Sequence, residues 1–184
     1  MKRILLTGMS GTGKTTLIAE LAARGYRAVD ADCDEYSMWV TVAAQSDVAG
    51  TPVEPDRDWM WREDQVQRLL DSANGEVLFV SGCASNMDRF LPQFDHVVLL
   101  SAPASDIVAR LASRTTNTYG KNPQEMARVL DLIETVEPLL RRIAGVELDT
   151  SVPLNEVIVA LIALTRTDRK PVILQLEARH ADGN

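Results

Sequence analysis

Residues 1–16 read MKRILLTGMSGTGKTT, so three glycines and a lysine stand directly after a short apolar run. The apolar run covers residues 4–6 and has polar neighbours, which is typical of a strand buried on both faces. From Thr15 onward apolar residues recur at helical spacing, and Gly25 is placed to end that helix. The glycine-rich stretch is therefore predicted to be a turn that leads from a strand into a helix.

Residues 8–15 match the pattern G-x-x-x-x-G-K-[ST], the Walker A motif or P-loop, in the strand-to-helix context that the motif requires. Glycine has no Cβ, so it can adopt positive φ and let backbone N–H groups turn toward an anion. The start of the helix adds unpaired N–H groups and the positive end of its dipole. We expect this turn to bind the phosphates of a nucleotide, through Gly8, Gly11, Thr12, Gly13, Lys14, Thr15 and Thr16.

Two side chains of the motif have specific roles in phosphate chemistry. Lys14 is expected to place its ammonium group on the β and γ phosphates, which makes it a catalytic candidate. The Thr15 hydroxyl is expected to ligate Mg²⁺. The alternative is an ordinary glycine-rich turn that carries a lysine, but the strand, the spacing and the helix together favour the phosphate site.

The composition is that of one globular domain. The chain has 184 residues, of which 46% are hydrophobic and 24% charged, and its net charge of -7 argues against a nucleic-acid surface. Cys33 and Cys83 show neither metal-ligand spacing nor a disulfide framework, which favours a reducing cytoplasm. The apolar runs are too short for a signal peptide or a membrane span, so we expect no membrane partner.

Strand and helix patterns alternate along the rest of the chain, which predicts one α/β domain with a parallel sheet between helices over residues 1–164. The role of the tail, residues 165–184, is left open by the sequence: packing on the body and packing on a second copy of the chain are the two hypotheses. The expected strands are 26–29, 77–80, 96–100 and 146–148; the expected helices are 59–71, one capped by Ser105, 126–136 with an interruption near Pro138, and 154–164; the expected loops are 45–58 and 115–123.

Asp30 and Asp32 follow the second strand, at the carboxyl end that adjoins the phosphate loop in a parallel sheet. One carboxylate is expected to hold Mg²⁺ through water, and the other to orient or deprotonate an acceptor hydroxyl. We assign Asp30 to the metal and Asp32 to the acceptor and to catalysis. The alternative is that both acids only form the turn after the strand.

Arg62 and Gly82 are the other acceptor-site candidates. Arg62 falls in a gap of the apolar stripe of the helix expected over 59–71, so it is expected to face the protein body and to bind an anionic group of the acceptor. A pair with Glu63, or an exposed side chain, remains the alternative. Gly82 follows the third strand, where a small residue lets a ligand approach the backbone.

Arg110 and Arg114 lie four residues apart on one helix and lead into the loop 115–123, which we interpret as a mobile lid. Arginines in this position can neutralise the charge that develops on the transferred phosphoryl group, so both are catalytic candidates. A basic helix end that interacts only with the helix dipole is the alternative.

Together these residues resemble the adenylate-kinase-like branch of P-loop kinases, and within it shikimate kinase and gluconate kinase, over residues 2–164. The resemblance implies a three-layer α/β/α P-loop NTPase fold with a five-stranded parallel sheet in the order 2-3-1-4-5. It also implies ATP and Mg²⁺ as cofactors, and an adenine pocket at residues 150–153 that includes Thr150. It rests on the P-loop, Asp30-Ala31-Asp32, Arg62-Glu63, Ser81-Gly82-Cys83, Arg110 with Arg114, and Asp149-Thr150.

The sequence therefore predicts ATP-dependent transfer of the γ-phosphate to a hydroxyl of a small, anionic metabolite. A nucleoside monophosphate kinase is the alternative enzyme, but an acceptor phosphate is already ionised and needs no base such as Asp32. A nucleotide-binding module without catalysis is the third hypothesis, and it leaves the paired aspartates and the lid arginines without a role. The nucleoside monophosphate hypothesis would use Arg62 with Arg110, Arg114, Arg141 or Arg142 on the acceptor phosphate.

Overall fold

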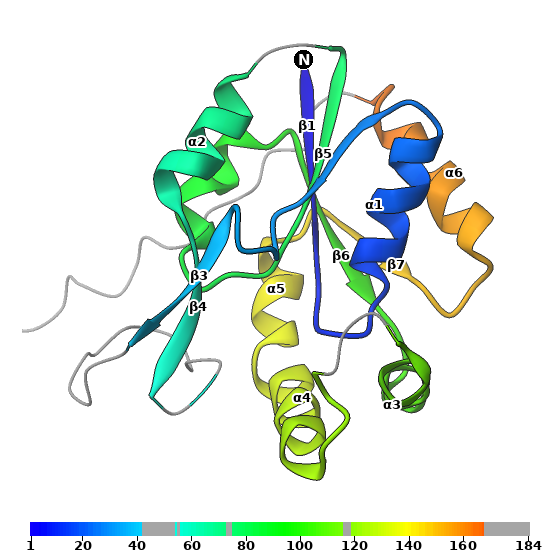
Figure 1. Cartoon of the computed structure of the whole chain (residues 1–184). Coiled ribbons are helices and arrows are strands. Elements are labelled where there is room, and N and C mark those ends of the chain that lie inside the picture. The colour runs from blue at the N-terminus through cyan, green and yellow to red at the C-terminus, as the bar shows by residue number, and fades with distance from the viewer. Residues whose placement is uncertain (42–53, 55, 73–74, 116–118, 168–184) are drawn as a thin grey trace, which may run out of the picture.

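The computed structural model describes residues 1–41, 54, 56–72, 75–115 and 119–167 (Figure 1). A five-stranded parallel sheet forms its centre, in the order β2-β5-β1-β6-β7. Counted among themselves along the chain, these five strands have the order 2-3-1-4-5, and the predicted α/β class is confirmed. The strands are β1 (Lys2–Thr7), β2 (Arg27–Asp30), β5 (Val77–Ser81), β6 (His96–Ser101) and β7 (Val146–Asp149).

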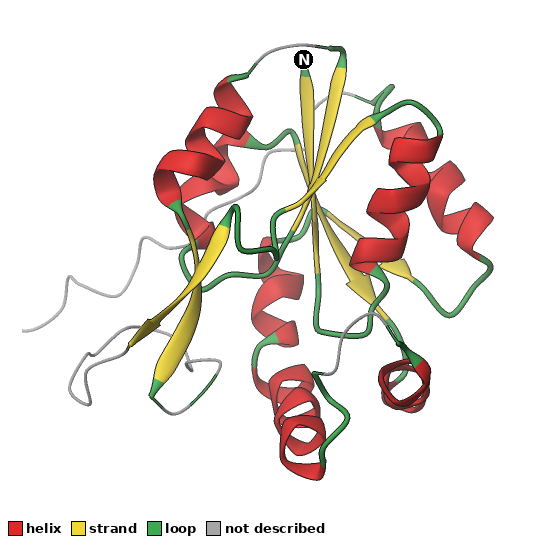
Figure 2. Ribbon diagram, in the orientation of Figure 1, coloured by secondary structure: helices red, strands yellow, loops and turns green. Residues whose placement is uncertain are grey.

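Helices cover both faces of the sheet and give the molecule three layers (Figure 2). One face packs against α1 (Lys14–Ala23) and α6 (Leu154–Leu164). The other face packs against α2 (Glu63–Asp71), a short 3₁₀ helix (Met87–Gln93) and α5 (Glu137–Ile143). The remaining helices, α3 (Ala104–Ser113) and α4 (Pro123–Thr135), pack on each other through Ile107, Leu111 and Val129.

The central strand β1 explains why the chain begins with an apolar run. Leu5 lies opposite Val80 and Val97 and faces the core on one side of the sheet, whereas Ile4 and Leu6 face the core on the other side. All three β1 residues are 0% exposed. Because both faces are covered at these three positions, consecutive residues are apolar, and the usual alternation with polar residues disappears there.

A two-stranded antiparallel hairpin replaces part of what the sequence pattern predicted as loop and helix. It pairs β3 (Ser37–Thr41) with β4 (Arg57–Trp61). The prediction that a helix begins at Trp59 was therefore wrong. Residues 59–61 belong to β4, and Trp59 and Trp61 lie on the same face of it because side chains alternate between the two faces of a strand. Most of the loop expected over 45–58 lies outside the described residues, namely 42–53 and 55.

The other predicted elements differ little from the structure. Ser105 was wrong as a helix cap, because the N-cap of α3 is Pro103. The expected interruption near Pro138 is confirmed: α4 ends at Thr135, and Pro138 stands in the first turn of α5, where its missing N–H is not needed. Residues 168–184 of the predicted tail lie outside the described part. Among the described helices, none has the length and apolar character of a membrane span.

Candidate active site

The phosphate loop joins β1 to α1 at the carboxyl edge of the sheet. Gly8, Gly11 and Gly13 have φ values of 147°, 89° and 91°, in a region that L-residues rarely adopt. A Cβ on Gly8 would lie 2.3 Å from the carbonyl oxygen of Leu100, and a Cβ on Gly11 would lie 2.9 Å from Cγ2 of Ile107. The loop therefore needs glycine both for its conformation and for its close contact with β6 and α3.

The side chains of Thr12 and Lys14 form hydrogen bonds within the phosphate loop. The Thr12 side chain is buried, and its Oγ1 donates a 2.8 Å hydrogen bond to the Met9 carbonyl. Lys14 Nζ donates to the carbonyls of Gly8 at 2.7 Å and Met9 at 3.4 Å. Thr16 is exposed on the first turn of α1. The expected contacts of these residues with ATP stay predictions.

Asp32 faces the P-loop lysine. Its Oδ2 lies 3.6 Å from Lys14 Nζ, and both side chains are largely buried, with exposed fractions of 24% and 10%. Its Oδ1 accepts a 3.0 Å hydrogen bond from the backbone N–H of Cys83, which follows the neighbouring strand β5. The structure thus brings together two predicted catalytic residues, one at the start of α1 and one in the segment that follows β2.

Asp30 contacts the other predicted metal ligand. Its Oδ2 accepts a 2.7 Å hydrogen bond from Thr15 Oγ1. Its Oδ1 accepts hydrogen bonds from Ser81 Oγ at 3.0 Å and from the backbone N–H of Asp32 at 3.1 Å. Within the described residues, no three His, Cys, Asp or Glu side chains gather as a metal cluster. A hydroxyl and a carboxylate beside the phosphate loop nevertheless fit Mg²⁺, which keeps several water ligands and takes few from the protein.

The end of β5 supplies two contacts that the sequence reasoning missed, the Ser81 hydroxyl and the Cys83 backbone N–H. Both could have been found from the strand order, because β5 lies between β2 and β1 and its end must adjoin Asp30 and Asp32. Burial raises the pKa of the Cys83 thiol, and the nearby Lys14 ammonium offsets only part of that effect. A raised pKa keeps the thiol neutral, which agrees with a packing role.

Gly82 lies beneath an aromatic ring. A Cβ at this position would be 2.8 Å from Cζ2 of Trp61, a residue that is 2% exposed and packs edge-on against Phe90 at a centroid distance of 5.6 Å. Gly82 is therefore required here by the indole ring. A ligand could reach its backbone only if Trp61 moved, and the assignment of Gly82 to the acceptor site stays a prediction.

Arg62 is the N-cap residue of α2, so it precedes the helix whose apolar stripe was used to predict the direction of its side chain. Its Nε donates to the backbone carbonyls of Asp34 at 3.1 Å and Ser37 at 3.3 Å. These contacts bring the guanidinium group to the segment that follows Asp32. The alternative pair with Glu63 is absent from the described part, where Glu63 pairs with Arg89.

The two arginines of the expected lid region have different partners. Arg110 donates two hydrogen bonds to Thr150, from Nη1 to Oγ1 at 3.0 Å and from Nη2 to the carbonyl oxygen at 2.6 Å. Its Nη1 also donates to the Gly11 carbonyl at 3.4 Å. It thus connects the phosphate loop to the turn after β7. Arg114 donates to the Tyr119 carbonyl, and burial lowers its pKa. Residues 116–118 of the expected lid lie outside the described residues.

The comparisons with known proteins agree with this geometry. A shikimate kinase from Acinetobacter baumannii in complex with shikimate has a TM-score of 0.57 at 18% identity, with 89% of this chain and 92% of that chain covered. A gluconokinase from Sinorhizobium meliloti 1021 has a TM-score of 0.54 at 21% identity, with 89% and 91% covered. A shikimate kinase from Bacteroides thetaiotaomicron has a TM-score of 0.55 at 19% identity, with 90% and 99% covered. These likenesses show the fold, and they confirm the predicted P-loop kinase fold.

Among curated proteins, none matches this sequence. A family model described as AAA domain (AAA_18) matches residues 4–131, which is more than half of the chain and includes the phosphate loop, both aspartates, Arg62 and Arg110. The chain therefore belongs to the AAA_18 family of AAA domains.

Proposed function

We propose that this protein is an ATP-dependent phosphotransferase that transfers the γ-phosphate to a hydroxyl group of a small molecule. The observation that carries the proposal is the position of Asp32, whose carboxylate lies between Lys14 Nζ and the backbone N–H of Cys83. A carboxylate this close to the P-loop lysine is within reach of the oxygen that would attack the γ-phosphate.

The nucleotide would bind through the phosphate loop. The Lys14 ammonium, which now donates to carbonyls of the loop itself, would turn to the β and γ phosphates. Thr15 and Asp30 would hold Mg²⁺, which neutralises phosphate charge when it is bound. Arg110 and Thr150 would contribute to the nucleotide site, since they join the loop to the turn where the adenine pocket is expected.

Asp32 would orient the acceptor hydroxyl and accept its proton as the phosphorus–oxygen bond forms. Arg62 would anchor an anionic group of the acceptor. Its Nε is engaged with backbone carbonyls, which fixes the guanidinium plane beside the segment after Asp32. Arg114 would neutralise charge on the transferred group, which requires it to exchange its contact with the Tyr119 carbonyl for a phosphate oxygen.

A nucleoside monophosphate kinase is the second candidate, and the hairpin favours it. The Trp39 and Trp59 rings pack at a centroid distance of 5.0 Å, and the Arg57 guanidinium carbon lies 4.4 Å from the Trp39 ring centroid. Trp39 is 39% exposed, so part of the ring can still receive a ligand. Exposed indole rings stack well on planar groups such as nucleobases.

A coupled assay of ATP consumption separates the two candidates. Purified protein would be offered hydroxy acids, sugars, aminoglycosides and nucleoside monophosphates, and ³¹P NMR would identify the phosphorylated product. We expect a hydroxylated small molecule to stimulate ATP consumption, and nucleoside monophosphates to leave it unchanged. Efficient phosphorylation of a nucleoside monophosphate that persists in Asp32→Asn would reject the hydroxyl acceptor. Failure of every compound together with failure to bind an ATP analogue would reject phosphotransfer itself.

A further inference from the structure

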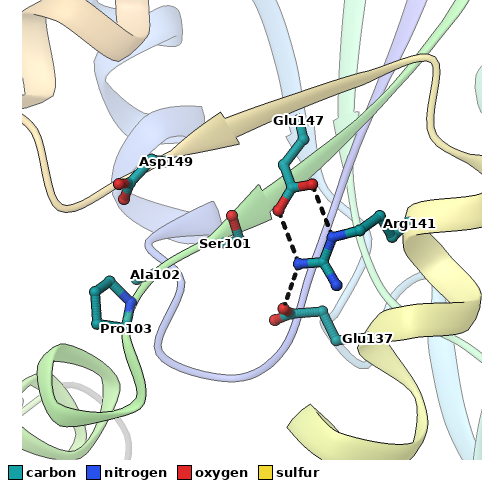
Figure 3. Close-up of a pocket in the computed structure, with 7 residues that line it drawn as sticks. All are labelled: Ser101, Ala102, Pro103, Glu137, Arg141, Glu147 and Asp149. Carbon is teal, nitrogen blue, oxygen red and sulfur yellow. Dashed lines mark hydrogen bonds and ion pairs between the residues drawn. The ribbon is translucent and has the colours of Figure 1, made fainter.

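A hollow lies at the carboxyl ends of β6 and β7, against α5 (Figure 3). Its volume is about 400 Å³, which is enough for a small organic molecule. The carboxyl ends of parallel strands are the edge at which α/β proteins bind ligands. The hollow is lined by Ser101, Ala102, Pro103, Glu137, Arg141, Glu147 and Asp149.

The hollow is distant from the proposed acceptor. Asp32 follows β2, whereas Glu147 and Asp149 lie on β7, and β2 and β7 are the two edges of the five-stranded sheet. Four steps between neighbouring strands separate them by about 19 Å. Whatever binds in this hollow is therefore a different ligand, or a different part of a ligand, from the group that Asp32 would contact.

The charge of the hollow is negative. The single guanidinium group of its lining, that of Arg141, is already satisfied by carboxylates (Figure 3). Its Nε and Nη2 donate to the two oxygens of Glu147 at 2.8 Å, and Nη2 also donates to Glu137 Oε1 at 2.8 Å. These bonds hold the pKa of Glu147 below its usual range and raise that of Arg141. Two carboxylates contact the guanidinium group and a third, that of Asp149, also lines the hollow, so the lining carries more negative than positive charge and an anionic ligand would be repelled.

Glu137 is the unusual residue of this set. It is 6% exposed, and its Oε2 atom is buried without a hydrogen-bond partner among the described residues. A buried carboxylate oxygen that has lost its water and found no hydrogen-bond donor is energetically unfavourable, and a ligand that donates to it would remove that penalty. Asp149 lies across the hollow from Glu137, at the end of β7; it is exposed and accepts a 2.8 Å hydrogen bond from the Ser151 N–H (Figure 3). The nearby Arg110 offsets part of the Asp149 charge, but Glu137 keeps an oxygen that lacks a donor.

We propose that this hollow binds an organic cation, a molecule with a primary ammonium group that donates to Glu137 Oε2. Asp149 adds a second carboxylate near the mouth of the hollow, and Ser101 to Pro103 form the wall opposite α5. A metal ion fits less well, because both Glu147 oxygens are occupied by Arg141 and the described residues hold no metal-ligand cluster. This site does not depend on phosphotransfer.

Isothermal titration of the nucleotide-free protein with 1,4-diaminobutane tests the site. The matched neutral probe is 1,4-butanediol, which has the same length but no charge. We expect the diamine to bind the wild-type protein and the diol not to bind. Glu137→Gln should weaken diamine binding at least tenfold, whereas Glu134→Gln, an exposed glutamate near the end of α4, should leave it unchanged.

Thermal unfolding, monitored by circular dichroism, would reveal whether Glu137→Gln folds. If it does not fold, a second variant keeps the test decisive. Asp149→Asn changes an exposed carboxylate of the same hollow, and it should weaken diamine binding about threefold. The proposal is overturned if the wild-type protein does not bind the diamine, if the diol binds equally well, or if both variants bind as the wild type does. If the wild-type protein bound Ca²⁺ but not the diamine, and these variants lost Ca²⁺ binding, the proposal would be wrong and the hollow would be a metal site. Because the titration contains no ATP, its failure leaves the proposed phosphotransfer untouched.

Discussion

Thr15 Oγ1 donates a 2.7 Å hydrogen bond to Asp30 Oδ2, and this bond links the first turn of α1 to the end of β2. β5, the strand between β1 and β2, contributes to the same cluster, because Ser81 Oγ donates to Asp30 Oδ1. These bonds hold the hydroxyl and the carboxylate side by side next to the phosphate loop. Preorganised oxygen ligands beside a phosphate loop are what a Mg²⁺–nucleotide complex requires.

Asp30→Asn should raise the Mg²⁺ concentration needed for half-maximal activity by about 10- to 100-fold, since residues that hold or orient metal ligands typically contribute that much to metal affinity. The measurement is the dependence of ATP turnover on Mg²⁺ concentration. Asp34→Asn is the matched control, because Asp34 belongs to the same segment and is exposed. If the dependence on Mg²⁺ concentration were unchanged, Asp30 would not be a metal ligand and its role would be purely structural.

Asp32→Asn should lower kcat about 10²–10⁴-fold, because the amide cannot accept the proton of the acceptor hydroxyl. The KM for ATP should change little, because Asp32 is not part of the phosphate loop that would bind the nucleotide, although its carboxylate lies 3.6 Å from Lys14 Nζ. Steady-state kinetics with the acceptor identified in the screen would measure both constants. If kcat stayed near the wild-type value, Asp32 would not be the base.

Lys14→Ala should abolish turnover and leave the protein folded. The Lys14 ammonium makes its hydrogen bonds to carbonyls of the phosphate loop, and its removal leaves the hydrophobic cores on both faces of the sheet intact. Activity measurements and thermal unfolding of the same preparation would separate the two effects. Phosphoryl transfer at the wild-type rate would contradict the assignment of the phosphate loop.

Gly8→Ala should destabilise the protein by more than about 2 kcal/mol, because strain at positive φ and a clash with the backbone add to each other. The new Cβ would lie 2.3 Å from the Leu100 carbonyl oxygen, which is backbone and cannot turn away. Gly25→Ala is the control: φ is 85° there, but no atom lies within 4 Å, so only strain of about 1 kcal/mol is expected. Urea unfolding would measure both, and equal losses would show that the contact with Leu100 has no effect.

Cys83 should resist alkylation while Cys33 reacts. Burial raises the pKa of the Cys83 thiol, so at any pH below that raised value a smaller fraction is thiolate, the reactive form. Cys33 is exposed. Iodoacetamide at about pH 8 followed by peptide mass spectrometry would give the two rates, and Cys33→Ser would isolate Cys83. Equal rates in the folded protein would be inconsistent with a partly buried thiol whose pKa is raised.

The sequence by itself determined the phosphate loop and the kind of sheet that carries it. The positive φ at positions 8, 11 and 13 is a property of the local backbone, and the motif spacing specifies glycine at two of these positions, 8 and 13. The apolar run of β1 and the alternation of strands and helices predicted a covered parallel sheet. In such a sheet the strand ends meet at one edge, so Asp30 and Asp32 could be placed near Lys14 without any knowledge of their contacts.

Only the tertiary structure decided what surrounds that centre. The hairpin of β3 and β4 depends on pairing between segments about 20 residues apart. The spacing of apolar residues around Trp59 is also compatible with a helix, so it could not predict this pairing. The cover of Trp61 over Gly82, the bond of Arg110 to Thr150 and the cluster of Glu137, Arg141 and Glu147 all join residues that are distant in the chain or lie on different elements. Such contacts follow from how the layers pack, and a local sequence pattern carries no signal for them.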